Sequence, residues 1–358
     1  MWGKTVDSEI RDTQLPVDFI RTVAIVLVIL LHAAIEPVPI VNTVTQQEVT
    51  RWIASNIYNS LARPCVPLFV MLSGALLLQP SKINEPLRVF FKKRLNRIAL
   101  PFIFWGAAFF AWDIFVNHDT FSVNFIVQGI LTGPYNHFWF LYMLGGLYLL
   151  TPVLRIVVGY ADWKVVRYFF VIWFLGTSIV PLFGLFGLYS LNLNVFPLVG
   201  WLGYFLLGAY LPKMRIRSSI LYAALLVGFA WTIIGTYVAA ATVGGTYSLY
   251  FYDYLTANVV LASVSLFMLL LTMPVHIRNP PSFSKKLLHQ VSQNTLPIYL
   301  FHVMILESLQ KGYFGFTISV TTMNPVLEIP LITAVTFFVS FGIIYLLKKM
   351  PYARKLLG

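Results

Sequence analysis

The chain contains 358 residues, of which 58% are apolar and only 11% are charged, and its net charge is +12. Soluble domains are typically about 45–50% apolar and about 25% charged, so this composition excludes a soluble globular enzyme and a disordered chain. The positive charge does not indicate a nucleic-acid partner, because the basic residues lie in short loops between apolar segments instead of forming one charged patch.

Apolar segments divide the chain into ten predicted transmembrane helices, which is typical of an all-α polytopic membrane protein. A helix crosses a bilayer in about 20 residues, so ten helices with short loops fit this length. The segments lie near residues 17–36, 62–80, 98–116, 137–157, 166–187, 197–212, 219–242, 254–274, 294–310 and 326–347. A shorter apolar run at 121–132 is expected to lie at the interface or to re-enter the membrane. The longer outer segments, 37–60, 117–136 and 242–253, are expected to form a cap over whatever opens outward.

The distribution of basic residues predicts the orientation of these helices. Cytoplasmic loops of membrane proteins are enriched in Lys and Arg. With the N-terminus inside, only Arg51, Arg63 and Lys311 of the 25 Lys and Arg residues fall in outer segments, and Arg21 lies within the first span. We therefore expect both termini to be cytoplasmic.

The first span carries ionisable side chains in an otherwise aliphatic segment, VDFIRTVAIVLVILLHAAIE. Arg21 and His32 are eleven residues apart, so a helix places them on one face, about 16 Å apart along its axis. Asp18 is spaced to pair with Arg21, and Glu36 is spaced to accept a hydrogen bond from His32 and fix its tautomer. Ionisable groups within a span favour a functional role. The alternative is that the inner pair reaches back to the interface and the outer pair marks only the end of the helix.

A basic cluster opens the third span in the segment FFKKRLNRIALPF. Arg94 and Arg97 are neighbours on a helix because they are three residues apart, and Lys93 lies beside them. Arginine binds phosphate through a bidentate fork, so the cluster is a candidate phosphate site. The alternative is that the cluster serves only to orient the helix.

The fourth and ninth spans contain two further histidines. His137 and Trp139 begin the fourth span, where a histidine could hydrogen-bond a sugar, although an aromatic belt explains the tryptophan as well. His302 and Glu307 lie in the ninth span about 140° apart around a helix, so they need not share a site. In the second span, Gly74 is suited to close helix packing. No cluster has the spacing typical of a strong metal site.

Six segments occur in a fixed order along the chain. They are Arg21-x10-His32, VPLFVMLSGALLL, FFKKRLNRIALPFIFW, HFWFLYMLGGLYLLTPVL, YDYLTANVVLASVSLFMLLL and LPIYLFHVMIL. Together they resemble the integral-membrane acyltransferase family 3, which modifies surface polysaccharides and other cell-envelope molecules in bacteria. The resemblance covers about residues 14–347 and depends on the order of the segments and the x10 spacing.

The resemblance implies a membrane-bound O-acyltransferase of the inner or plasma membrane. Such an enzyme transfers an acyl group, commonly acetyl, from cytoplasmic acyl-CoA as co-substrate to a hydroxyl of a cell-envelope glycan or a lipid-linked sugar. We expect no metal cofactor. The expected organisation is a cytoplasmic tail at residues 1–13, an acyltransferase domain at residues 14–347 and a basic cytoplasmic tail at residues 348–358.

The resemblance also implies roles for individual residues. Arg21 and His32 match the family's arginine and essential histidine, and the two arginines before the third span match its basic motif. The expected catalytic residues are His32, Arg21 and Glu36, the expected residues for the acyl-CoA phosphates are Arg94, Arg97 and Lys93, and the expected acceptor-binding residues are His137, Trp139, His302 and Glu307. Glu36 and Glu307 are the candidates for the family's acidic partner. His32 acts either as a general base or as a nucleophile that is acylated first, and the sequence leaves both routes open.

Two other functions fit some of these residues. A transporter or flippase for a lipid-linked saccharide would also contain intramembrane Arg, His and Glu, but the chain lacks the paired broken helices typical of many such proteins. A non-catalytic scaffold or receptor gains nothing from ionisable groups along its first helix. Consumption of acyl-CoA by the purified protein distinguishes the enzyme from both.

Overall fold

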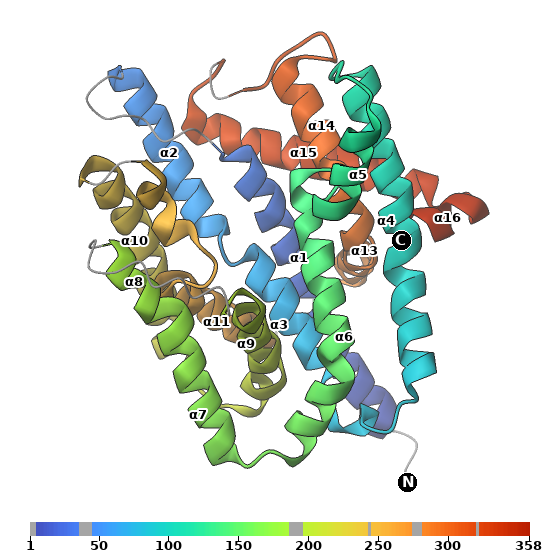
Figure 1. The fold of residues 1–358 in the computed structure, drawn as a ribbon, viewed down its shortest axis with the longest axis vertical. Coiled ribbons are helices and arrows are strands. Elements are labelled where there is room, and N and C mark those ends of the chain that lie inside the picture. The colour runs from blue at the N-terminus through green and yellow to red at the C-terminus, as the bar shows by residue number, and fades with distance from the viewer. Residues whose placement is uncertain (1–4, 36–44, 186–195, 243–244, 274–280, 320–321) are drawn as a thin grey trace.

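The computed structural model describes residues 5–35, 45–185, 196–242, 245–273, 281–319 and 322–358. Over these ranges the chain forms helices and no strands (Figure 1). Each of the ten predicted spans contains a helix, which confirms the all-α fold. In chain order they are α1 (Thr5–Ala33), α3 (Cys65–Leu77), α4 (Leu87–Phe115), α6 (Trp139–Tyr160), α7 (Trp163–Phe174) with the π-helical turn η3 (Leu175–Ile179) and α8 (Val180–Leu185), α9 (Phe196–Tyr210), α10 (Ser218–Thr242), α11 (Ala257–Leu271), α14 (Thr295–Lys311) and α15 (Pro325–Leu347).

Several helices lie outside the ten predicted spans. The short apolar run at 121–132 forms α5 (Val123–Thr132), and the C-terminal segment contains α13 (Ser282–Gln293) and α16 (Pro351–Leu357). The second part of the outer segment 37–60 forms α2 (Gln46–Ala62), which follows a capping box at Thr45. The apolar pattern misses α2 because this helix buries polar side chains: Ser55, Asn56, Asn59 and Ser60.

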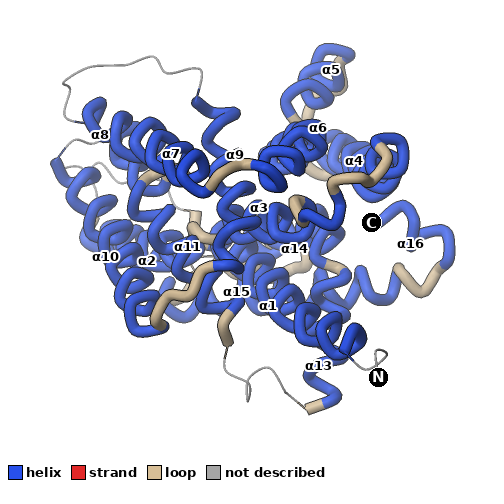
Figure 2. The backbone as a smooth tube through the Cα atoms, turned by 90° about the horizontal axis from the view of Figure 1, so that it is seen from below, coloured by secondary structure: helices blue, strands red, loops and turns tan. Residues whose placement is uncertain are grey.

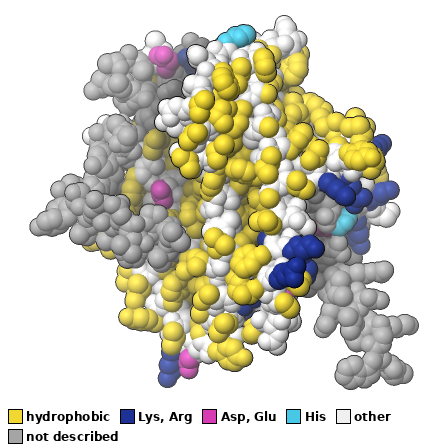
Figure 3. Space-filling view, turned by 45° about the vertical axis from the view of Figure 1, so that its right-hand side comes forward, with side chains coloured by type: hydrophobic (Ala, Val, Ile, Leu, Met, Phe, Trp, Pro, Cys, Tyr) yellow, Lys and Arg dark blue, Asp and Glu magenta, His cyan; other side chains and the backbone are white. Residues whose placement is uncertain are grey.

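Eight helical segments among the described residues are long and apolar enough to cross a membrane. The two predicted spans without such a segment are those of α9, which has 15 residues, and α14, which has 17. The helices α3, α7 and α11 reach the required length only together with adjoining helical segments. Apolar side chains cover most of the face seen in Figure 3. This surface is typical of a chain that lies in a bilayer, because lipid-facing positions need no polar groups. The cytoplasmic orientation of both termini stays a prediction.

The helix α1 lies near the middle of the bundle, beside α3 and α14, with α2 and α10 on one side and α4 and α6 on the other (Figure 1, Figure 2). The helices α3 and α9 cross at very close range. A Cβ atom added to Gly74 would lie 1.8 Å from the carbonyl oxygen of Phe205, and one added to Gly208 would lie 1.8 Å from that of Met71. Small residues let backbones approach in this way, so the packing predicted for Gly74 is confirmed.

A buried arginine fixes the turn between α3 and α4. Arg155 of α6 is 2% exposed, and its guanidinium donates to the carbonyls of Leu77 and Lys82 at 2.8 and 3.0 Å and to the Glu85 carboxylate at 3.0 Å. Lys93 also pairs with Glu85, and hydrogen bonds from Lys93 and Arg155 hold the pKa of Glu85 below its ordinary value. This network positions the beginning of α4, the helix that carries the basic cluster.

Candidate active site

The helix α1 contributes side chains at two levels of the bundle. Arg21 lies near the middle of the helix and borders a pocket, whereas His32 lies in its last turn against α14. Asp18 does not form the predicted ion pair with Arg21, because its carboxylate lies 2.9 Å from Nδ1 of His289 in α13. The Arg21 guanidinium is therefore available to the pocket.

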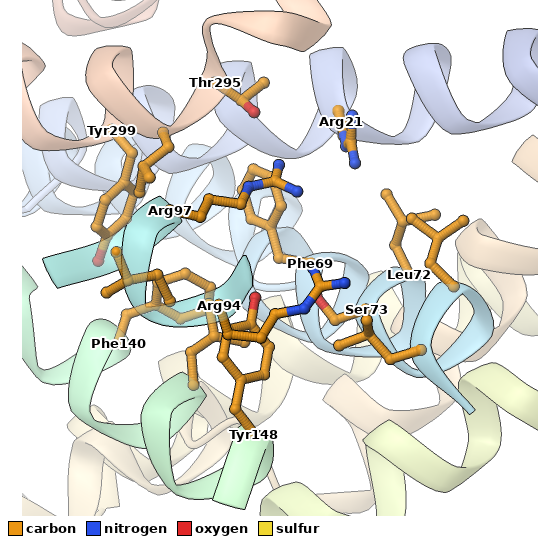
Figure 4. A pocket seen from close by; sticks show the side chains of 15 residues that line it. Arg21, Phe69, Leu72, Ser73, Arg94, Arg97, Phe140, Tyr148, Thr295 and Tyr299 are labelled. Atoms are coloured by element: carbon orange, nitrogen blue, oxygen red, sulfur yellow. The ribbon is translucent and has the colours of Figure 1, made fainter. Parts of the chain in front are cut away.

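The pocket beside Arg21, here called the arginine pocket, contains three guanidinium groups. Arg21 comes from α1, and Arg94 and Arg97 come from α4 (Figure 4). The remaining lining residues are Phe69, Leu72, Ser73, Leu76, Leu77, Ile98, Phe140, Leu144, Tyr148, Thr295, Leu296 and Tyr299, and the pocket holds about 110 Å³ of free space. None of the described lining residues is acidic, so the pocket carries a positive charge that favours an anionic ligand.

Within the basic cluster, Arg94 and Arg97 line the arginine pocket, whereas Lys93 does not. Figure 4 shows the side chains of Arg94 and Arg97 directed into the same space as Arg21, with Tyr148 and Ser73 beside Arg94. The Arg94 Nε is buried and has no hydrogen-bond partner in the described part of the chain. Lys93 does not line the pocket, because its ammonium pairs with Glu85 at 2.8 Å. Of the three basic residues, the two arginines therefore line the arginine pocket and the lysine does not.

His32 and His302 form a pair between α1 and α14. Nδ1 of His32 lies 2.9 Å from the Val28 carbonyl and 3.2 Å from Nε2 of His302, while Nδ1 of His302 lies 2.6 Å from the Tyr299 carbonyl. A carbonyl only accepts hydrogen bonds, so both Nδ1 atoms carry the proton in the neutral rings. Nε2 of His302 is then an acceptor for His32, and Nε2 of His32 keeps a free lone pair for proton transfer.

Tyr299 connects the histidine pair to the arginine pocket. Its side chain lines the pocket, its backbone carbonyl accepts the His302 hydrogen bond, and its hydroxyl donates to the His137 carbonyl at 2.5 Å. The buried His137 ring lies with its centroid 5.7 Å from that of His302. Neither ring nitrogen of His137 has a hydrogen-bond partner among the described residues. Three predicted residues from three spans therefore come together here, and one tyrosine borders both them and the arginines.

Most of the chain is similar in sequence to known proteins. Residues 16–345 match the family model described as an acyltransferase domain, that of acyltransferase family 3. The chain belongs to acyltransferase family 3. A proposed acetyltransferase of Acidianus two-tailed virus is 25% identical to this acyltransferase over 271 residues, which are 71% of this chain and 76% of the relative. No solved structure is significantly similar to it.

Family membership confirms the resemblance seen in the motifs and makes the protein an acyltransferase. It favours the enzyme over the transporter and scaffold alternatives. In the described parts of the acyltransferase, no group of three or more His, Cys, Asp or Glu side chains is placed to hold a metal ion.

The acidic residues expected near His32 have other positions. Glu36 lies outside the described residues. Glu307 accepts hydrogen bonds from Trp112 at 3.0 Å and from Tyr135 at 3.1 Å, and it pairs with Lys311. These contacts tie α4, the segment before α6 and α14 together, and they lie on a different face of α14 from His302, as the 140° separation predicts. In the acyltransferase, the group that faces Nδ1 of His32 is His302.

Several neighbours of the site were not expected from the sequence. Trp201 and Tyr254 pack against Trp139, with ring centroids 5.6 and 6.0 Å from that of Trp139, and the three rings form an aromatic cluster. Tyr148 and Tyr299 border the arginine pocket of the acyltransferase. The three-residue spacing of Tyr299 and His302 is a signal that could have linked them, because residues at i and i+3 share a helix face.

Proposed function

We propose that the protein is an O-acyltransferase that moves an acyl group, commonly acetyl, from acyl-CoA to a hydroxyl of a cell-envelope glycan or a lipid-linked sugar. The observation that carries this proposal is that the arginine pocket and the histidine pair are adjacent. A pocket with three guanidinium groups and a pair of histidines share Tyr299 as a common border. An anionic carrier and a proton-transfer group are the two requirements of this reaction.

The arginine pocket is the proposed site for the phosphates of acyl-CoA. Arginine is suited to this role because its planar fork makes two parallel hydrogen bonds to phosphate oxygens. Arg94 and Arg97 are three residues apart on α4, and Arg21 approaches from α1, so an anion between them is contacted from two helices. On the predicted orientation, this pocket lies toward the cytoplasm, where acyl-CoA is present.

His32 is the proposed general base. Its free Nε2 takes the proton of the acceptor hydroxyl as the oxygen attacks the thioester carbonyl carbon, and a tetrahedral intermediate forms. The intermediate collapses, the C–S bond breaks, and the proton passes from His32 to the departing sulfur. His302 is the proposed positioning residue, because its Nε2 lies 3.2 Å from Nδ1 of His32 and stabilises the imidazolium that forms.

The acceptor is proposed to approach the histidines from the side of Trp139 and His137. A sugar ring presents C–H groups that pack on aromatic faces, and the partly exposed rings of Trp139, Trp201 and Tyr254 contact one another here. The unpartnered ring nitrogens of His137 are available for a hydroxyl of the acceptor or for a bridging water. We propose the inner or plasma membrane as the location of the protein.

The decisive experiment is acyl transfer by the purified protein in lipid nanodiscs. We expect radiolabelled acetyl-CoA to lose its acetyl group to an envelope glycan extract, with the label in an ester that mild base removes. Rapid quenching without the extract tests the covalent route, because an acyl-histidine accumulates only if His32 is acylated first. Absence of both CoA release and CoA binding would contradict the proposed function.

Removal of either pocket arginine is expected to weaken donor binding. Arg94→Ala or Arg97→Ala deletes charged hydrogen bonds worth about 1.5–3 kcal/mol, which corresponds to a rise of roughly 10- to 100-fold in the KM for acetyl-CoA. Lys93→Ala is the matched control, since Lys93 is a neighbouring cation that does not line the pocket. Equal KM values for all three variants would show that the donor binds elsewhere.

A further inference from the structure

A fourth arginine, Arg63, is connected through Asn59 to the end of α1 that carries His32, and the mechanism above does not use it. Arg63 lies at the junction of α2 and α3, and its guanidinium is half-buried. Nη1 donates to the Tyr252 carbonyl at 3.0 Å, Nη2 donates to Oδ1 of Asn59, and the group lies 4.3 Å from the centroid of the Tyr252 ring. Two elements that are distant in sequence therefore hold this guanidinium in one position.

The charge of Arg63 has no acidic partner in the part of the chain that the structure describes. The ion pairs among the described residues involve Glu85, Asp18 or Glu307, and none of them includes Arg63. Its Nε is buried and has no hydrogen-bond partner among the described residues. A guanidinium without a counter-ion inside a membrane protein is costly, and such groups are typical of functional sites. The arrangement therefore fits a residue that meets a negative charge during the reaction.

Arg63 is connected to the end of α1 that carries His32. Asn59, which accepts the Arg63 hydrogen bond, donates from Nδ2 to the Ala34 carbonyl at 3.3 Å, two residues beyond His32. On its other side the guanidinium lies 5.7 Å from the ring centroid of Tyr254, which belongs to the aromatic cluster around Trp139. Arg63 thus lies between the proposed base and the proposed acceptor side.

We propose that Arg63 stabilises the oxyanion of the tetrahedral intermediate formed beside His32, an inference that depends on the proposed function. When the acceptor oxygen bonds to the thioester carbon, the electron pair of the C=O bond moves to the carbonyl oxygen, and the guanidinium meets this new negative charge. As the C–S bond breaks, the electron pair returns to the C=O bond. The charge exists only in the intermediate, so Arg63 acts on the chemical step and not on donor binding.

The test compares Arg63→Met, Arg63→Lys and Arg63→Ala with the unaltered full chain in nanodiscs, using acetyl-CoA and an envelope glycan extract. Loss of one oxyanion-stabilising group lowers kcat by about 100-fold or more, so Arg63→Met is expected to show this fall while the KM for acetyl-CoA and the Kd for CoA change less than about threefold. Arg63→Lys keeps the charge and is expected to retain part of the activity. Ethylguanidinium is expected to raise the kcat of Arg63→Ala by at least about tenfold.

The control variant is Thr232→Val. Thr232 is buried and accepts a hydrogen bond from Asn258, whereas the hydrogen bonds of Arg63 go to Tyr252 and Asn59. The Thr232 variant is therefore expected to keep kcat. The proposal is overturned if Arg63→Met keeps kcat, or if the fall in kcat is matched by a loss of folded protein that ethylguanidinium does not reverse. If the unaltered protein transfers no acetyl group, the proposed function fails first. If it does so through His32 and Arg63→Met is unimpaired, only the role of Arg63 fails.

Discussion

Replacement of His32 with alanine is expected to abolish measurable acyl transfer while CoA still binds. In the histidine pair, both Nδ1 atoms carry a proton because they face carbonyl groups, and Nε2 of His302 accepts a hydrogen bond from His32. Only Nε2 of His32 therefore has a free lone pair. General-base catalysis contributes about 10²- to 10⁴-fold to a rate, so kcat is expected to fall by that factor. The Kd for CoA is expected to stay unchanged, since the arginine pocket does not include His32. Single-turnover kinetics and calorimetry measure the two quantities.

The matched control for this variant is His118→Asn. His118 is exposed and adopts a positive φ of 59°, a conformation that asparagine accepts. Retention of more than about a tenth of kcat in His32→Ala, where general-base loss costs at least about 10²-fold, would remove the base from the mechanism. His302→Gln offers a finer test, because glutamine keeps a hydrogen-bonding group near Nδ1 of His32 and should lose less activity than His302→Leu.

The second large effect is expected on folding. Gly208→Ala places a methyl group where only 1.8 Å separates it from the carbonyl oxygen of Met71, and a backbone atom cannot turn aside as a side chain can. Overpacked cores cost about 1–3 kcal/mol and occasionally more, and this contact belongs at the upper end. We expect the yield of folded protein and its thermal unfolding temperature in detergent to fall sharply.

Gly146→Ala is the control for the helix crossing. Gly146 lies on α6 and has no atom within 4 Å of an added Cβ, so this alanine is expected to be neutral or slightly stabilising. Equal unfolding temperatures for the two variants would show that α3 and α9 can separate without loss of stability. Their crossing also positions Ser73, the neighbour of Gly74, in the wall of the arginine pocket.

Helical periodicity is sufficient to predict how the side chains of one helix are placed relative to one another. The eleven-residue spacing separates Arg21, which borders the arginine pocket, from His32, which lies against His302. The 140° separation of His302 and Glu307 gives them different partners. Apolar composition likewise predicts a helix in every expected span, since lipid selects for apolar length.

Contacts between helices could not be predicted in this way. Asp18 is correctly spaced for Arg21, yet it pairs with His289 because α13 packs against α1. The pairing of His32 with His302 depends on how α1 and α14 cross, which no local pattern encodes. The sequence places Arg63 only in an outer segment. Its contact with Tyr252 could not be predicted, because Tyr252 lies far along the chain.

The separation of Arg21 and His32 on one straight helix has a consequence for the choice of donor. Eleven residues of helix span about 16 Å, and Tyr299 lies between the two levels. Acetyl phosphate carries its phosphate next to its acyl carbon, so it cannot reach from the guanidinium groups to the imidazole, whereas the pantetheine arm of CoA spaces the two apart. On the proposed mechanism, we therefore expect the first helix to favour acyl donors with a long tether over compact ones.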